Sequence, residues 1–181
     1  MNLEELFRME ATDDEEYILA LANELDLNKD LLIFLAKEST RPSVEVYAQK
    51  YNGIVDEKLW LRGYCPICGS KPKMAELQGE EGRRTLLCSF CGNVWFYKRL
   101  KCPICESGDP EALKYFYIEG EETACRIDIC ERCRGYIKTV DSRKISGEVV
   151  PFIEDLGSLH LDIIAIKEGY TKVSGNMLGI K

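Results

Sequence analysis

Eight cysteines stand in four pairs, each with two residues between its cysteines. A turn of that length lets both sulfurs face one ion, and tetrahedral zinc or rubredoxin-type iron takes four thiolates about 2.3 Å from the metal. Paired in order, the spacings are C-x2-C-x19-C-x2-C and C-x2-C-x24-C-x2-C. The first lies within the usual zinc-ribbon range and the second just outside it. The sequence therefore predicts two four-cysteine metal sites, whose ligands would be Cys65, Cys68, Cys88 and Cys91, and Cys102, Cys105, Cys130 and Cys133.

Other uses of the cysteines are weaker interpretations. The stretch MNLEELFRMEATDDEE lacks the basic start and apolar run of a secretory signal, and no apolar run approaches the length of a membrane span, about 18 residues. We therefore expect a cytoplasmic protein, and lasting disulfides are uncommon in that reducing compartment. Interleaved pairing, first pair with third and second with fourth, stays open.

Catalysis is not expected from these residues. Catalytic zinc keeps an open position, whereas eight thiolates for two ions leave none, so we predict that the protein is not an enzyme. The ninth cysteine, Cys125, is predicted to be a small buried residue, with a reactive thiol as the alternative. His160, the only histidine, borders an apolar helix face, which predicts a partly buried, hydrogen-bonded side chain rather than a ligand.

The elements around the cysteines predict an α+β fold. Residues 1–60 read as a helical N-terminal region, in which Thr12 and Asn28 are candidate caps and Pro42 would begin a third helix. Residues 61–100 and 101–181 are predicted as two tandem rubredoxin-like or zinc-ribbon modules, the second with a C-terminal helix.

That C-terminal helix is predicted from Leu156, Leu159, Ile163 and Ile166, which recur at helical intervals before Gly169.

The two modules look like an internal duplication. The blocks 64–97 and 101–140 each open with CPIC, continue through a polar segment and a β-like run, and end in a second pair and another strand. The β-like runs are TLLC, NVWFY, LKYFYI, TACRIDI and GYIKTV. Gly69 and Gly92 follow their cysteine pairs directly, where a positive φ is expected. In the second block the glycines come later, so those turns are expected to differ slightly.

Charge is unevenly distributed. The chain carries a net −7, which argues against non-specific nucleic-acid binding, but residues 62–102 hold 8 basic and 3 acidic side chains. Basic and aromatic residues in this block could contact an acidic partner surface. The alternative is that the aromatics pack under the cysteine turns and the charges are solvated. The predicted partner-binding residues are Arg83, Arg84, Trp95, Lys98 and Arg99.

Four stretches carry a family resemblance. CPICGSKPKMAEL, GRRTLLCSFCGNVWFYKRLKCPIC, RIDICERCRGYIKTVD and DLGSLHLDIIAIKEGYTKVSGN, in this order, resemble the FdhE family of formate dehydrogenase accessory proteins over roughly residues 60–177. The motifs are R-x-L-x-C-S-x-C, a tryptophan, K-R, CPxC, C-x-x-C-x-x-Y-I-K and L-x-L-D. The first sixty residues match no motif of that family.

The resemblance implies a cytoplasmic, enzyme-specific chaperone. It implies binding to the catalytic subunit of a molybdenum- or tungsten-dependent formate dehydrogenase, in support of that subunit's maturation. It also implies that the eight paired cysteines form rubredoxin-like centres with zinc or iron. An iron redox protein is the alternative, a nucleic-acid-binding zinc ribbon is a third choice, and a homo-oligomer stays open.

Overall fold

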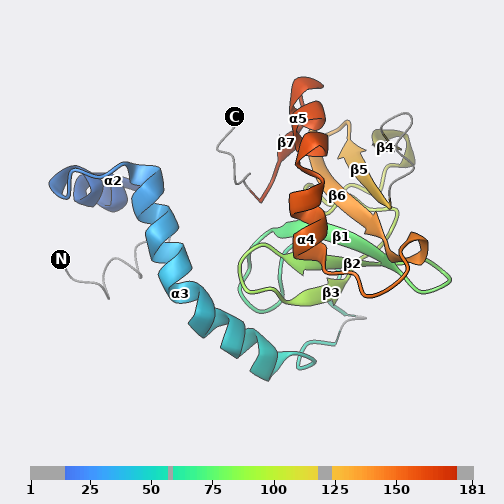
Figure 1. Cartoon of the computed structure of the whole chain (residues 1–181), viewed down its shortest axis with the longest axis horizontal. Helices are drawn as coiled ribbons and strands as arrows, with labels where there is room; N and C mark the ends of the chain where they lie inside the picture. The colour runs from blue at the N-terminus through green and yellow to red at the C-terminus, as the bar shows by residue number, and fades with distance from the viewer. Residues whose placement is uncertain (1–14, 57–58, 118–123, 175–181) are drawn as a thin grey trace. The chain divides into compact units, whose positions relative to one another are not determined.

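A computed structural model describes residues 15–56, 59–117 and 124–174 (Figure 1). Contacts divide the chain into two compact units, residues 1–50 and 51–181, and each unit is described by itself. The predicted mixture of helices and sheet, with a helical N-terminal segment, is confirmed. Within the described residues, no helix is both long and apolar enough to cross a membrane.

The first unit is helical. Helix α2 spans Glu15–Glu24 and helix α3 spans Lys29–Tyr51. The predicted cap at Asn28 is confirmed, because its Oδ1 accepts a hydrogen bond of 2.8 Å from the backbone N–H of Asp30. The predicted cap at Thr12 lies outside the described residues. The two helices pack through a small apolar core of Ile18, Leu21, Ala22, Leu32 and Ala36.

The prediction that Pro42 begins a third helix is wrong, because α3 continues through it. A proline inside a helix removes one hydrogen bond, at a cost of about 3 kcal/mol, without reversing the chain. Side chains in the turn before it stay bonded to the helix backbone: Ser39 Oγ donates to Leu35 O at 2.6 Å, and Thr40 Oγ1 donates to Ala36 O at 3.2 Å.

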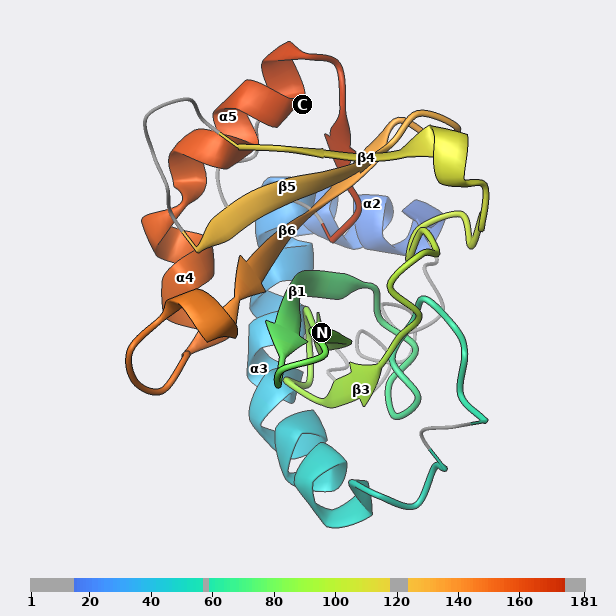
Figure 2. The ribbon, with the colours of Figure 1, turned by 90° about the vertical axis from the view of Figure 1, so that its right-hand side faces the viewer.

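The second unit is built on a seven-stranded mixed sheet of described residues (Figures 1 and 2). Its strands follow the order β3-β2-β1-β6-β5-β4, and β7 pairs with β6. The strands are β1 Pro72–Gln78, β2 Arg83–Cys88, β3 Val94–Phe96, β4 Leu113–Phe116, β5 Cys125–Cys130, β6 Gly135–Asp141 and β7 Thr171–Lys172. Short 3-10 turns lie at Pro110–Ala112 and Ser142–Lys144.

The same order of elements occurs twice in this sheet. Each half consists of a CPIC turn, two antiparallel strands, a second cysteine pair and a third antiparallel strand, in that order. Parallel pairing of β1 with β6 joins the halves. Strand β1 was not predicted, because its sequence, PKMAELQ, contains no β-branched or aromatic residue. Strand β1, which the sequence does not predict, is therefore the strand that pairs with β6 and joins the two halves.

Two helices stand where the sequence predicts one. Helix α4 spans Pro151–Gly157, α5 spans Leu159–Lys167, and both pack against the sheet (Figure 1). The predicted apolar face is wrong in part, because Leu156 is 38% exposed and Ile163 is 41% exposed, whereas Leu159 and Ile166 are partly buried. Three of the buried residues in these helices and at their junction are polar. The buried residues are Asp155, Ser158, Leu161, Asp162 and Ala165.

The main core lies between the sheet and α5. It consists of Met74, Cys125, Ile127, Ile129, Tyr136, Val140, Leu161, Ala165 and Tyr170.

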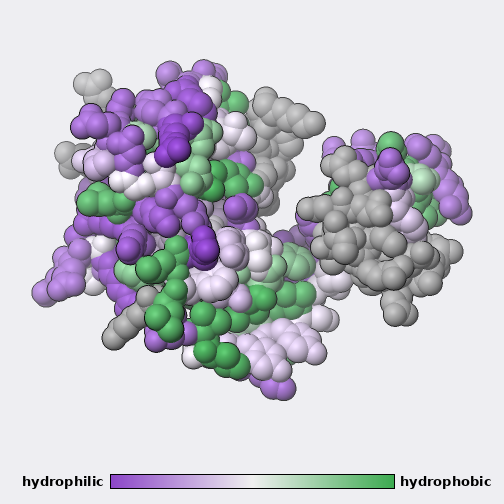
Figure 3. Space-filling view, turned by 180° about the vertical axis from the view of Figure 1, so that it is seen from behind, coloured by the Kyte–Doolittle hydropathy of each residue, from purple (hydrophilic) through white to green (hydrophobic). Residues whose placement is uncertain are grey.

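Figure 3 shows the opposite face of the molecule, where hydrophilic side chains dominate the upper part of the sheet unit and hydrophobic ones form smaller patches between them.

Candidate metal centres

The structure brings the eight paired cysteines together in two groups of four. Within each group the sulfur atoms all lie within 4.8 Å of one another. The grouping is sequential, and the interleaved alternative does not occur. We name the groups cluster I, which is Cys65, Cys68, Cys88 and Cys91, and cluster II, which is Cys102, Cys105, Cys130 and Cys133.

The distances between sulfurs fit a four-coordinate ion. A tetrahedron with metal–sulfur bonds of about 2.3 Å has edges of about 3.8 Å, whereas a disulfide joins sulfurs at about 2.05 Å. None of the nine cysteines forms a disulfide. Within cluster I the sulfur of Cys65 lies 3.5 Å from that of Cys91, and the sulfur of Cys68 lies 3.4 Å from that of Cys88. Within cluster II the Cys102–Cys133 and Cys105–Cys130 sulfur separations are 3.8 Å each.

The two CPIC turns have the same hydrogen bonds. In the first, the N–H of Ile67 donates to Cys65 Sγ at 3.4 Å; in the second, the N–H of Ile104 donates to Cys102 Sγ at the same distance. The backbone N–H of each opening cysteine also donates to the carbonyl oxygen five residues later, at 2.8 Å in both turns. Amide donors aimed at sulfur favour the thiolate form, which is the form that binds metal.

All four cysteine turns end in a left-handed residue. The prediction for Gly69 and Gly92 is confirmed, since their φ angles are 76° and 67°. The prediction that the turns of the second block differ is wrong. Glu106 and Arg134 take the corresponding positions with φ angles of 59° and 54°. A left-handed conformation costs a non-glycine residue roughly 1–2 kcal/mol, so neighbouring contacts must offset that cost.

Polar contacts hold both strained residues in place. Glu106 Oε1 accepts a hydrogen bond of 2.9 Å from the N–H of Gly63, and Oε2 forms an ion pair of 3.2 Å with Arg62. The bond from Gly63 lowers the pKa of Glu106 below its ordinary value. Arg134 donates to the carbonyl oxygen of Glu168 at 2.7 Å. These contacts tie the cysteine turns to segments before and after them in the chain.

Both clusters contain thiols whose pKa lies below its ordinary value. In cluster I a hydrogen bond with Cys68 opposes ionisation of Cys65, but those with Cys88 and Cys91 lower its pKa overall, to about 7. Hydrogen bonds from Cys65 and Cys88 hold the pKa of Cys68 well below its ordinary value. Hydrogen bonds with Cys65 and Cys68 raise the pKa of Cys88. In cluster II burial opposes ionisation of Cys105, but a hydrogen bond from the Ser107 backbone and the adjacent thiols lower its pKa overall. A cation that enters a cluster therefore meets a thiolate first and displaces the remaining protons.

The clusters differ in exposure. In cluster I only Cys68 is partly accessible. In cluster II, Cys105 is exposed and Cys133 is intermediate. Cluster II is thus the more open of the two to solvent, chelators and partners.

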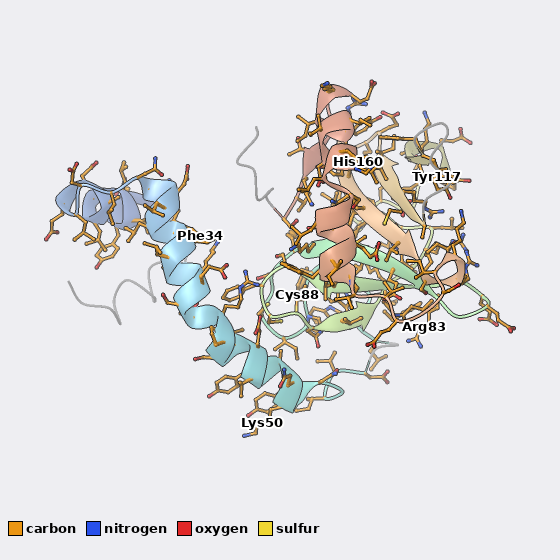
Figure 4. All side chains as sticks on the ribbon, viewed as in Figure 1. Phe34, Lys50, Arg83, Cys88, Tyr117 and His160 are labelled. Carbon is orange, nitrogen blue, oxygen red and sulfur yellow. The ribbon has the colours of Figure 1, made fainter. Side chains whose placement is uncertain are left out.

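The predicted partner-binding residues do not form one surface. Arg84 and Trp95 are buried, with 4% and 2% exposure, whereas Arg83, Lys98 and Arg99 are exposed. Arg83 and Cys88 lie at opposite ends of β2 (Figure 4). Trp95 donates its indole N–H to the carbonyl oxygen of residue 62 at 3.1 Å, which agrees with the alternative that the aromatics pack under the cysteine turns.

A buried ionic group, which we name the Lys138 cluster, was not predicted. Lys138 is fully buried, and its Nζ lies 2.8 Å from Asp155 Oδ1 and 2.7 Å from Asp162 Oδ2. Lys172 joins both carboxylates at 2.9 and 3.1 Å, and Tyr136 donates its hydroxyl to Asp162 at 2.8 Å. The available signal was the Y-I-K and L-x-L-D motifs, whose last residues are Lys138 and Asp162. The group fastens α4 and α5 to β6.

The two remaining candidate residues, Cys125 and His160, lie outside both cysteine clusters. Cys125 is 7% exposed, and burial together with the neighbouring Glu154 carboxylate raises its pKa to about 11, so the prediction of a small buried residue is confirmed. His160 is exposed on α5, so its predicted partial burial is wrong (Figure 4).

Comparison with known proteins agrees with this arrangement. Residues 64–99 match the family model of the FdhE central domain, and residues 100–178 match that of the FdhE C-terminal domain. The chain is 33% identical to the FdhE homolog of Aquifex aeolicus (strain VF5) across 97% of this chain and 62% of that protein. It is 35% identical to protein FdhE of Escherichia coli O127:H6 across 64% of this chain and 37% of that protein. The chain thus covers less than two thirds of these relatives' lengths.

A solved structure gives the same result. The crystal structure of the FdhE protein from Pseudomonas aeruginosa matches with a TM-score of 0.58 and 34% identity, over 65% of this chain and 41% of that one. The chain belongs to the FdhE family.

Proposed function

We propose that clusters I and II each hold one zinc or iron ion through four thiolates. The sulfur separations, the amide donors and the pKa pattern all support this role for the eight cysteines. The repeated order of elements supports the interpretation of residues 61–100 and 101–181 as two tandem rubredoxin-like modules. Four protein ligands to each ion would close both sites, which favours a structural role over turnover.

We further propose that the protein is a cytoplasmic accessory protein of formate dehydrogenase. It would bind the catalytic subunit of that enzyme and support its maturation as an enzyme-specific chaperone. The single observation that carries this proposal is membership of the FdhE family over residues 64–178, which include both clusters. In this function the metal ions stabilise the fold, and the surface of the fold recognises the partner.

A partner-binding surface is proposed at the exposed basic residues Arg83, Lys98 and Arg99. They are all cationic and accessible, so they suit an acidic patch on the partner. The contribution of Arg84 and Trp95 would be indirect, because both are buried.

Co-purification tests this function. The full chain with bound metal is immobilised, and the catalytic subunit of formate dehydrogenase from the same host is applied before and after cofactor insertion. We expect at least one form to be retained. Arg83→Glu combined with Lys98→Glu should weaken retention, whereas Lys167→Glu, at an exposed position on α5, should not. Retention of neither form would contradict the proposal.

An iron redox protein is the second candidate. The exposure of Cys105 favours it, because electron transfer requires a metal centre that a partner can approach. The visible absorption spectrum decides between the two: an iron–thiolate chromophore that can be reduced and reoxidised supports a redox role. A colourless protein with zinc in both clusters excludes it, since zinc has no redox chemistry.

A further inference from the structure

A basic cavity lies beside cluster II. Its volume is about 220 Å³. A single water needs about 10–15 Å³, and sites for drug-sized ligands begin at about 300 Å³, so this cavity suits a small ligand or one end of a larger one. Among the described residues that line it, one is acidic, Asp128, and five are basic: Arg84, Arg99, Lys101, Lys114 and Arg126.

The most buried cation of the cavity has unused donors. Arg84 is 4% exposed, and its Nη1 donates to the carbonyl oxygen of Lys101 at 3.2 Å. Its Nε and Nη2 have no hydrogen-bond partner among the described residues. The nearest carboxylate oxygen, Asp128 Oδ2, is 3.6 Å from Nη2, and Asp128 already accepts hydrogen bonds of 2.8 Å from Arg126 and Thr139.

The position of these two donors indicates what they bind. Nε–H and one Nη2–H lie side by side on the planar guanidinium, and they point the same way. This pair forms the two parallel hydrogen bonds by which arginine grips a carboxylate or phosphate group. A buried guanidinium with two unused donors is costly unless acceptors reach it.

The residues that line the cavity differ in exposure. Arg99, Lys114 and Tyr115 are exposed, whereas Arg84, Cys102 and Cys130 are buried. Exposed cations would attract an anion and guide it inward. Cys102 and Cys130 belong to cluster II, so a metal ion held there by four thiolates would place net negative charge beside these cations.

We propose that this cavity is a binding site for an oxyanion, the phosphate or carboxylate group of a small ligand, with Arg84 as the bidentate donor. Arg99 and Lys114 assist at its exposed side. The competing explanation is that the cations serve only as counter-charges for cluster II.

Anion titration of the full chain with both clusters metal-loaded tests the proposal. Inorganic phosphate, pyrophosphate, acetate and succinate are titrated separately at constant ionic strength. Binding to every variant is followed by titration calorimetry, and binding to the native chain is also followed by the Nε–H resonance of Arg84. We expect saturable binding of at least one anion, and the preferred group shows whether the site takes phosphates or carboxylates. Arg84→Lys keeps the charge but loses the fork, so binding should weaken about tenfold or more. Arg83→Lys is the matched control, at the exposed neighbouring position of β2 and outside the cavity.

The remaining measurements keep the test decisive if Arg84→Lys does not fold. Arg99→Ala combined with Lys114→Ala changes only exposed positions and should weaken binding several-fold. Elemental analysis of each variant should show an unchanged metal content. Saturable binding of none of the four anions, or equal losses in the Arg84 and Arg83 variants, overturns the proposal. So does an Arg84 variant that loses metal from cluster II while anion affinity stays the same, because that result assigns Arg84 to the counter-charge role.

Discussion

The Lys138 cluster gives the sharpest prediction about stability. Replacing Lys138 by Met keeps the length of the side chain but removes its charge. The native Nζ is fully buried, with carboxylate oxygens of Asp155 and Asp162 at 2.8 and 2.7 Å and the carbonyl oxygen of Asp155 at 2.6 Å. The Lys138→Met variant would therefore leave two nearly buried carboxylates with fewer partners.

The expected loss follows from these contacts. Breaking a buried ion pair by removing one partner costs about 3–5 kcal/mol. Lys172 remains 2.9 Å from Asp155 and 3.1 Å from Asp162, and Lys73 lies 3.4 Å from Asp155. Because both carboxylates keep a cation, we expect the lower end of that range, about 3 kcal/mol, which corresponds to roughly 10 °C in Tm for a unit of this size.

Urea unfolding followed by tryptophan fluorescence measures this loss in the right unit. The chain has 2 tryptophans, Trp60 and Trp95, and both belong to residues 51–181. Lys167→Met, at an exposed position on α5, is the control and should change stability by no more than about 0.5 kcal/mol. Adding Asp162→Asn to Lys138→Met should recover part of the loss, because it removes a buried carboxylate charge that has lost one of its two cations.

A small effect would refute this reasoning. Ion pairs that are exposed to solvent contribute about 0–1 kcal/mol. If Lys138→Met lost less than about 1 kcal/mol, or if Asp162→Asn made it worse, the Lys138 cluster would not be the fastening that we describe.

Three further predictions concern the metal sites and pH. A chelator should remove metal from cluster II before cluster I, because Cys105 is exposed; metal release with one equal rate for both clusters would contradict this. Gly135→Ala should lower the metal content of cluster II and the Tm, because its Cβ would lie 3.3 Å from the sulfur of Cys133 and 2.5 Å from Ile104 Cδ1; elemental analysis and a thermal melt check it. Burial opposes ionisation of Asp155, but the hydrogen bond from Lys138 and the charge of Lys172 lower its pKa overall, so its contribution is complete above the unfolded value of about 4 and is lost as pH falls through the lower folded value. The difference in stability between the native chain and Asp155→Asn should therefore shrink below about pH 4, and a difference that grows there would be inconsistent with it.

The cysteine clusters were predictable because their constraint is local. Two cysteines separated by two residues can face one ion from a single turn, and the chain needs only a strand or two to bring the second pair to it. The structure therefore groups the cysteines in the order that the sequence predicts.

Elements that depend on distant partners were not predictable. Strand β1 has no local β signal, and it is fixed by pairing with β2 and with β6, more than fifty residues later in the chain. The buried face of α4 and α5 contains Asp155 and Asp162, which an amphipathic pattern assigns to the surface. The positions of Lys138 and Lys172, on other elements, make their burial favourable.

The left-handed residues show the same limit on a smaller scale. The positive φ angles of Gly69 and Gly92 can be predicted from the sequence, because glycine adopts a positive φ at little cost. Glu106 and Arg134 adopt similar angles because contacts from elsewhere hold them, and nothing in the local sequence records those contacts.

Metal content is the most direct test of the central claim, that two closed four-thiolate sites stabilise this fold. Elemental analysis of the purified full chain should find two equivalents of zinc or iron, one for each cluster. Cys88→Ser, in cluster I, and Cys130→Ser, in cluster II, should each retain about one equivalent, because each cluster supplies its own ligands. A native chain with less than one equivalent, or serine variants that keep both ions, would contradict the account.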